Sequence, residues 1–226
     1  MERKLTLIKF FTLTGNILIP FYAFLLFWSY GKNTIGFIFF LFISIAIIER
    51  AWETFKTSKE KKREEMHGDW TLAAVTGTYL LLFFFTITEF YLRVKAVNNW
   101  ITLMGLLLVA LSFRVRFWGM AALGKQWAVH AVGVQKIKKV RLVKLGPYKY
   151  VRHPIYLGII IELIAFPIVA NAFFAMMFAF IVCIPLVIIR AHFEEGASYR
   201  RFGEKYKTYR NEVGMFFPTQ LFNRRF

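Results

Sequence analysis

The stretch Leu142–Gly158, LVKLGPYKYVRHPIYLG, joins a basic segment to an apolar run that is long enough to enter a bilayer. Its Arg, His and Tyr side chains are therefore expected where the membrane meets water. A second polar cluster, Arg190–Tyr209, follows the next apolar run. A tight hairpin between the two runs would return this cluster to the same side, so the two clusters together are the predicted active site.

The composition of the chain is typical of a polytopic membrane protein. Hydrophobic residues make up 58% of the 226 positions, 27 residues are Phe, and the mean hydropathy is +0.49. The net charge of +17 does not indicate nucleic-acid binding, because the basic residues alternate with apolar runs instead of gathering on a soluble face. One cysteine allows no disulfide framework, and four widely spaced histidines predict no metal site.

Six apolar segments predict an all-α integral membrane protein with about six transmembrane helices and a single domain over residues 1–226. The expected spans are residues 5–28, 34–52, 70–91, 100–113, 154–169 and 172–189. The last two form a C-terminal helical hairpin, in which Pro185 is expected to bend the second arm.

Three connecting segments have distinct patterns. Residues Glu53–Asp69 carry mixed charges and predict a solvated loop or helical extension. Residues Arg114–Arg152 are amphipathic and are expected to form short pieces broken at glycines, Gly119 among them. The alternating stretch Val134–Val143 suits a strand or an interfacial segment better than a buried helix.

The basic residues predict the orientation of the chain in the membrane. With six spans, all but three of the 30 Lys and Arg residues fall on one side; the exceptions are Lys32, Arg93 and Lys95. Basic residues are retained on the cytoplasmic side. Both termini and both polar clusters are therefore expected in the cytoplasm, and the short N-terminal half favours a prokaryotic cell membrane.

Arg190, His192, Glu194 and Glu195 follow the last span, and a continuing helix would place Arg190 and Glu194 on one face. Taken alone, Arg190 and Glu194 can be explained as an arginine that extends toward the membrane surface beside a carboxylate. Arg152 and His153 can likewise be explained as basic residues of the kind that commonly flank a membrane span. Their position on the same side of one hairpin favours a shared functional site.

These motifs resemble the isoprenylcysteine carboxyl methyltransferase family. The pattern LVxxGPYxxxRHPxYxG is followed by a hydrophobic hairpin, RxxxEE, FG and YxxY before a final Pro. The matching residues are Leu142, Val143, Gly146, Pro147, Tyr148, Arg152, His153, Pro154, Tyr156, Gly158, Arg190, Glu194, Glu195, Phe202, Gly203, Tyr206, Tyr209 and Pro218. The preceding Arg116–Trp127 is also similar to the family. The resemblance covers residues 99–226, the methyltransferase-like core, whereas the spans within 1–98 match no motif.

The resemblance implies methyl transfer from S-adenosylmethionine in a cytosolic site without a Rossmann domain, and no GxGxxG motif occurs in this chain. The implied acceptor is membrane-embedded or lipid-linked. The implied cofactor-binding residues are Leu142, Val143, Tyr148, His153, Pro154, Tyr156 and Glu194. Arg190 is expected to bind the acceptor, and Arg190 and Glu194 are the expected catalytic residues.

A carboxylate such as that of an isoprenylcysteine is the favoured acceptor. It is already a nucleophile, and Arg190 can orient it through paired hydrogen bonds. A phenol, amine or thiol would instead need deprotonation by His153, Glu194 or a tyrosine. The sequence leaves this choice open, as it does the oligomeric state.

Two departures from the family pattern bear on the acceptor and on the tail. Ser198 and Tyr199 replace the family's leucines, and Gly214 replaces a Pro. Two other functions stay open. An NADPH-dependent sterol reductase has a similar hairpin, with a Cys and a Trp where this chain has acids and Tyr206. A small transporter or scaffold would use polar groups within the spans, of which Glu89 and Glu162 are the candidates.

Overall fold

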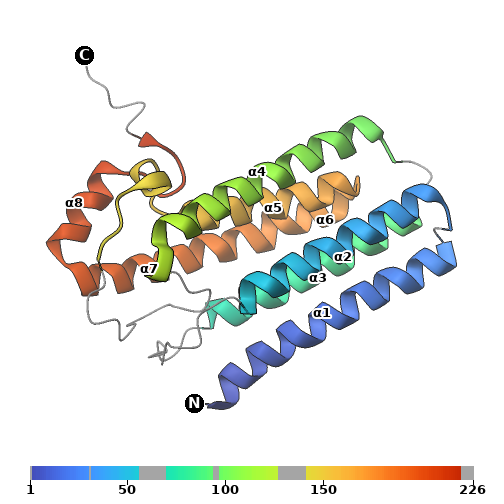
Figure 1. The fold of residues 1–226 in the computed structure, drawn as a ribbon, viewed down its shortest axis with the longest axis horizontal. Helices are drawn as coiled ribbons and strands as arrows, with labels where there is room; N and C mark the ends of the chain where they lie inside the picture. Colours follow the sequence, from blue (N-terminus) through green and yellow to red (C-terminus); the bar gives the residue numbers. More distant parts are fainter. Residues whose placement is uncertain (1, 31, 56–69, 94–96, 127–140, 220–226) are drawn as a thin grey trace. The chain divides into compact units, whose positions relative to one another are not determined.

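The structure is a computed structural model that describes residues 2–30, 32–55, 70–93, 97–126 and 141–219. Figure 1 shows its α-helices in chain order: α1 (Glu2–Tyr30), α2 (Thr34–Phe55), α3 (Thr71–Leu92), α4 (Asn99–Leu123), α5 (Pro154–Val169), α6 (Phe173–Phe178), α7 (Ile184–Phe202) and α8 (Glu204–Glu212). Two short 3-10 helices are η2 (Gly124–Gln126) and η3 (Gly146–Lys149), and η4 (Ala179–Cys183) is a π-helical segment. No strand occurs in these residues, so the all-α prediction is confirmed for them.

The helix bounds follow the hydropathy pattern except at the end of α4 and at the end of the last predicted span. Helix α5 has both predicted ends, whereas α4 continues ten residues beyond its predicted end at Phe113. The predicted break at Gly119 was wrong. A Cβ on Gly119 would lie 2.8 Å from the Ile155 side chain, so this glycine makes room for a packed neighbour inside a continuous helix. The helix ends instead at Gly124, whose φ of +51° is a left-handed conformation that favours glycine.

The last predicted span also extends further than expected. It was predicted to end at Ile189, but α6, η4 and α7 run from Phe173 to Phe202. The π-helical segment η4 ends two residues before Pro185, and the bend expected from this proline stays a prediction. Proline lacks an N–H and its ring crowds the carbonyl four residues earlier, which disrupts the regular α-helical ladder.

Three helical segments are long and apolar enough to cross a membrane: Thr71–Leu92, Asn99–Leu123 and Phe173–Phe202. Ile17–Tyr30 and Pro154–Val169 are shorter apolar helices. This search covers the described part of the chain, and the count of six spans stays a prediction. Residues 56–69 of the predicted solvated loop and 134–140 of the predicted strand or interfacial segment lie outside the described residues.

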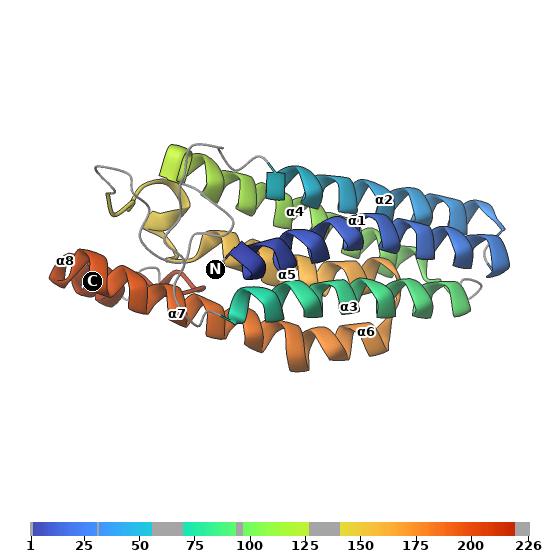
Figure 2. The ribbon, with the colours of Figure 1, turned by 90° about the horizontal axis from the view of Figure 1, so that it is seen from below.

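The chain divides into two compact units. The first comprises residues 1–57, 70–108 and 163–186, and the second comprises residues 58–69, 109–162 and 187–226. In the first unit, α1 lies beside α2 and α3 in both ribbon views (Figures 1 and 2). Its core is aromatic: Phe39 stacks on Phe90 with ring centroids 3.7 Å apart, and Phe83 lies 4.9 Å from Phe166.

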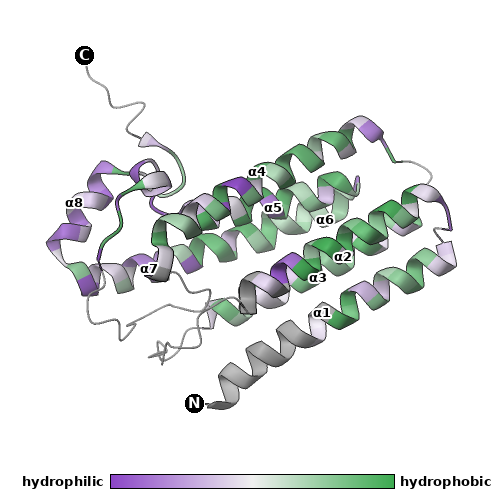
Figure 3. Ribbon diagram, viewed as in Figure 1, coloured by the Kyte–Doolittle hydropathy of each residue, from purple (hydrophilic) through white to green (hydrophobic). Residues whose placement is uncertain are grey.

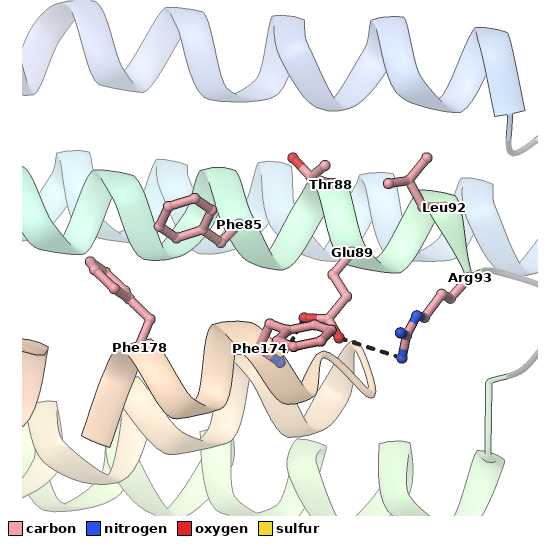
Figure 4. A pocket seen from close by; sticks show the side chains of 7 residues that line it. All are labelled: Phe85, Thr88, Glu89, Leu92, Arg93, Phe174 and Phe178. Atoms are coloured by element: carbon pink, nitrogen blue, oxygen red, sulfur yellow. Dashed lines mark hydrogen bonds and ion pairs between the residues drawn. The ribbon is translucent and has the colours of Figure 1, made fainter. Parts of the chain in front are cut away.

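Glu89 has a structural role in the first unit. Its Oε2 accepts hydrogen bonds from the backbone N–H groups of Phe174 (3.0 Å) and Ala175 (3.1 Å), and so caps the start of α6. Figure 4 shows this carboxylate beside Arg93 in a cavity of about 380 Å³, which is lined by Phe85, Thr88, Glu89, Leu92, Arg93, Phe174 and Phe178. A helix cap explains an acid in an apolar run without a transport function.

The second unit contains the hydrophilic end of the chain. Figure 3 shows α8 as largely hydrophilic. Tyr206, Tyr209 and Val213 nevertheless form a small buried cluster, against which Leu142 and Phe202 pack. This cluster packs α8 against the segment that carries the LVxxGPY motif. The site described next contains residues of the same segment.

Candidate functional site

The loop that carries the LVxxGPY motif is fixed at its start, Arg141, and at its turn, Gly146. The side-chain amide of Gln126 exchanges two hydrogen bonds with the backbone of Arg141, at 2.7 and 3.3 Å, which fixes the point where the motif begins. Gly146 then turns the chain with a φ of +61°. A Cβ there would lie 3.2 Å from that of Ala122, so the motif glycine is required by conformation and by close packing.

The C-terminal segment clamps the other end of the loop. Val151 forms an isolated parallel bridge with Gly214, and the N–H groups of Arg152 and His153 donate to the carbonyls of Gly214 (2.9 Å) and Met215 (3.1 Å). A Cβ on Gly214 would collide with the carbonyl oxygen of Phe217. The glycine that replaces the family's Pro therefore permits a tight turn in this chain.

Arg152 and Glu195 form a buried ion pair beneath the loop. The Arg152 Nε lies 2.6 Å from Glu195 Oε1, and its Nη1 donates to the carbonyls of Arg210 (3.0 Å) and Val213. His153 Nε2 lies 3.4 Å from the same carboxylate oxygen. The Glu195 side chain is only 4% exposed, and these contacts make it an anchor that holds α7, α8 and the loop together.

The neighbouring Glu194 has different surroundings. Its Oε1 accepts a hydrogen bond from the Tyr156 hydroxyl at 2.5 Å and lies 3.6 Å from Arg190 Nη2. The Tyr156 hydroxyl in turn accepts a hydrogen bond from Arg190 Nε at 2.9 Å. These three residues form a closed triad, hereafter the Tyr156 triad. Glu194 is 27% exposed and Arg190 is 2% exposed, so the carboxylate is the more accessible charged member.

Tyr148 is buried near Glu194 of this group. Its backbone carbonyl accepts a hydrogen bond from the Tyr209 hydroxyl at 2.7 Å. Burial raises the pKa of the Tyr148 phenol, and the nearby Glu194 carboxylate and Tyr209 raise it further. Tyr148 is therefore an uncharged aromatic side chain beside Glu194 at neutral pH.

A second buried ion pair joins α4 to α5. Arg116 Nη1 lies 2.5 Å from Glu162 Oε2, and both side chains are 1% exposed. Gly158 of the motif makes this possible, because a Cβ there would collide with Arg116 Cγ. Pairing with a neighbouring helix thus explains the acid Glu162 within an apolar span.

The structure brings most of the predicted site residues together. Arg190, Tyr156 and Glu194 are in direct contact, and the His153 ring lies 5.7 Å from that of Tyr156. Pro154 is buried as the first residue of α5. Leu142 packs into the tyrosine cluster instead of against the triad, and Val143 is half-buried in the loop. The roles assigned to these residues stay predictions.

Sequence reasoning missed the structural ion pairs. Arg152 and Glu195 were matched to the motif without a role, and Arg116 was seen only as part of a similar segment. The sequence signal for the Arg116–Glu162 ion pair was one charged residue in each of two otherwise apolar segments. The distribution of roles between Glu194 and Glu195 had no sequence signal, because adjacent helical residues point about 100° apart and only packing shows which one is buried.

Residues 103–198 match the model of the Isoprenylcysteine carboxyl methyltransferase (ICMT) family. Uncharacterized protein YpbQ of Bacillus subtilis is 28% identical over 165 residues, which cover 70% of this chain and 95% of that protein. Methanethiol S-methyltransferase of a Pseudomonas species is 39% identical over 71 residues, which cover 31% of this chain and 26% of that enzyme.

The fold also has a solved counterpart, the eukaryotic intramembrane Ras methyltransferase ICMT. The two structures superimpose with a TM-score of 0.64 over 91% of this chain and 86% of that chain, at 18% sequence identity. An identity this low supports a shared fold alone. The family match over residues 103–198 and this fold confirm the predicted resemblance to the isoprenylcysteine carboxyl methyltransferase family, and the long apolar helices indicate an integral membrane protein.

Proposed function

We propose that this protein transfers a methyl group from S-adenosylmethionine to a lipophilic acceptor at the cytoplasmic face of a bacterial cell membrane. The Tyr156 triad is the observation that carries the proposal, because it gathers the motif residues of both hairpin arms around one accessible carboxylate. The family match and the methyltransferase named among the relatives support the same reaction. The bacterial relatives support the proposed location.

The side chains present suit a cofactor with a sulfonium and an ammonium group. Glu194 offers a partly exposed carboxylate to a cation, and the rings of Tyr156 and His153 offer aromatic faces. We assign cofactor binding to Leu142, Val143, Tyr148, His153, Pro154, Tyr156 and Glu194. When bound, S-adenosylmethionine supplies an electrophilic methyl group and loses its positive charge in the reaction.

The chain's own contribution is alignment and exclusion of water. Arg190 and Glu194 are the proposed catalytic residues, with Arg190 on the acceptor side. Glu195 and Arg152 hold the loop against α7 and α8 through the buried ion pair. A rigid loop keeps donor and acceptor in line, and such alignment lowers the barrier of a displacement reaction.

The orientation of the chain belongs to the same proposal. Six spans with both termini in the cytoplasm would place the basic segments beside the anionic inner leaflet. Residues 1–98 would supply the lipid-facing entrance, and residues 99–226 the methyltransferase core. A cytoplasmic site has direct access to a soluble cofactor, whereas the acceptor would arrive through the bilayer.

Calorimetric titration of the detergent-solubilised protein tests the proposal. S-adenosylhomocysteine should bind, and NADPH should not. His153→Ala and Glu194→Gln should weaken that binding, whereas Arg190→Ala should spare it and abolish turnover. Glu204→Gln is the matched control, because Glu204 is 76% exposed and pairs only with Lys207 in the described structure. Binding of NADPH alone would favour the reductase, and binding of neither ligand would favour a transporter or scaffold.

A further inference from the structure

The cavity of the first compact unit lies where several helix ends meet. It is formed between the end of α3 and the start of α6, and it shares no residue with the Tyr156 triad. Nearby, the Tyr91 hydroxyl donates to the carbonyl of Gly36 at 2.9 Å, and the Asn98 N–H donates to the side chain of Asn171 at 3.0 Å. The end of α3 and the starts of α2, α4 and α6 therefore meet at one end of this unit.

This end of the unit has the composition of a membrane–water interface. Trp28, Tyr30 and Trp100 are exposed, and the Lys32 ammonium lies 3.8 Å from the centroid of the Trp28 ring. Exposed Trp and Tyr side chains beside basic residues are typical of the headgroup level of a bilayer. Arg93 directly follows the last residue of α3, so the cavity lies at the depth that lipid headgroups occupy.

The cavity combines an apolar lining with two opposite charges. Its volume of about 380 Å³ falls within the range of roughly 300–1,000 Å³ that is usual for small-molecule sites. Leu92 and Phe174 are both more than half exposed, which shows that the cavity opens at the surface. The apolar lining consists of Phe85, Leu92, Phe174 and Phe178, and the charged side chains are Glu89 and Arg93 (Figure 4). Such a lining suits an amphipathic ligand with a charged head and a hydrocarbon chain.

Glu89 has one carboxylate oxygen with unused hydrogen-bonding capacity. Its Oε2 caps α6, whereas its Oε1 is buried and accepts no hydrogen bond from any residue that the structure describes. Arg93 Nη1 lies 3.8 Å from Oε1, which is beyond hydrogen-bond distance. The Glu89 side chain is only 9% exposed, and a buried carboxylate oxygen without a donor is unfavourable. A ligand with an N–H donor would supply the missing hydrogen bond.

Arg93 presents the opposite charge next to this carboxylate. Its side chain is 54% exposed, and its guanidinium carbon lies 5.6 Å from the centroid of the Phe174 ring. A guanidinium binds a phosphate group through paired hydrogen bonds. A headgroup that carries both a phosphate and a primary ammonium group therefore complements Arg93 and Glu89 together. A purely anionic headgroup would bring a second anion to Glu89, and a quaternary ammonium group has no N–H to donate.

We propose that this cavity binds one phospholipid with a primary ammonium headgroup, as in phosphatidylethanolamine. The ammonium group donates to Glu89 Oε1, Arg93 binds the phosphate, and the start of one acyl chain lies against Phe85 and Phe178. The lipid supplies the donor that Oε1 lacks, and by binding the folded state it stabilises the contact between α3 and α6. This inference is independent of the proposed methyl transfer.

Native mass spectrometry of the full chain in detergent tests the lipid class. The delipidated protein is titrated with phosphatidylethanolamine, phosphatidylcholine or phosphatidylglycerol of identical acyl chains. One phosphatidylethanolamine should bind per chain, at least about tenfold more tightly than either of the other lipids, a ratio that corresponds to about 1.4 kcal/mol. Equal affinities for the three lipids would overturn the proposal. Tightest binding of phosphatidylglycerol would also overturn it, because Arg93 would then select an anion alone.

Two variants connect this preference to the cavity. Glu89→Gln keeps a side-chain oxygen that can cap α6 but loses the charge, so the preference for phosphatidylethanolamine over phosphatidylcholine should fall to within about threefold. Arg93→Gln should weaken the binding of both lipids about tenfold, because both contain the phosphate. Since Arg93 is exposed, this variant tests the site even if Glu89→Gln does not fold.

Lys32→Gln is the matched control. Lys32 is a cation at the same end of the unit, but it does not line the cavity. This variant should bind all three lipids as the wild type does. An unchanged lipid preference in Glu89→Gln would refute the assignment of the ammonium site. An equal loss of affinity in Lys32→Gln and Arg93→Gln would refute the assignment of the phosphate site, because it would show a general effect of surface charge.

Discussion

Replacing Glu194 or Glu195 by Gln should separate catalysis from stability at two adjacent positions. Glu195 is 4% exposed and accepts the Arg152 Nε at 2.6 Å, so the neutral amide leaves a buried guanidinium without its counter-charge. Removing one partner of a buried ion pair costs about 3–5 kcal/mol. Gln keeps an acceptor oxygen, and Arg152 keeps two backbone carbonyl partners, so we expect the lower end, about 3 kcal/mol.

The corresponding change at Glu194 should cost much less stability. This side chain is 27% exposed, and its contact with Arg190 is 3.6 Å long. Water reaches the Glu194 carboxylate, and Gln keeps an acceptor oxygen for the Tyr156 hydroxyl, so we expect a loss of only about 1 kcal/mol. Cofactor affinity and turnover should fall instead, because Glu194 is the accessible carboxylate of the Tyr156 triad.

Hydrogen–deuterium exchange of the backbone amides in α8 measures the difference. Arg152 reaches the carbonyls of Arg210 and Val213 at the end of this helix, so weakening its ion pair loosens that end. A local loss of about 3 kcal/mol corresponds to roughly 10²-fold faster exchange. Glu194→Gln should leave α8 exchange within about fivefold of wild type. Equal acceleration in both variants would falsify the assignment of Glu195 as the structural member of the pair.

Two further predictions concern packing and pH. In a thermal melt, Gly158→Ala should destabilise the protein by about 1–3 kcal/mol, because the new Cβ would collide with the aliphatic part of the Arg116 side chain. Gly77→Ala is the control: its new Cβ would meet nothing within 4 Å, so this variant should be neutral or slightly stabilising. Burial raises the pKa of Tyr209 to about 12, with Arg152 lowering it and Glu195 raising it. The folded state therefore holds this proton more tightly than the unfolded chain, so stability should be constant below about pH 10 and decline between about pH 10 and 12. Tyr209→Phe should be less stable at neutral pH, because it loses the hydrogen bond to Tyr148, and should show a shallower alkaline decline.

Much of the fold follows from local pattern. The ends of α5 coincide with the predicted span because Pro154 suits a helix start and Asn171, in a left-handed conformation, turns the chain after it. Helix α4 was underestimated because Gly119 and Arg116 look like breaks in an apolar run. Both are packing partners of α5, and hydropathy along one helix carries no information about its neighbour.

The membrane class and most helical segments could be predicted from the sequence, because hydrophobic periodicity and loop charge are local properties of the chain. Three-dimensional packing was needed to show that Glu195 is an anchor, that Glu194 is accessible, and that Arg190 contacts Tyr156 and Glu194 within the Tyr156 triad. These distinctions depend on burial and on distances between α5, α7 and the C-terminal segment. Such quantities arise only when residues distant in sequence are packed together.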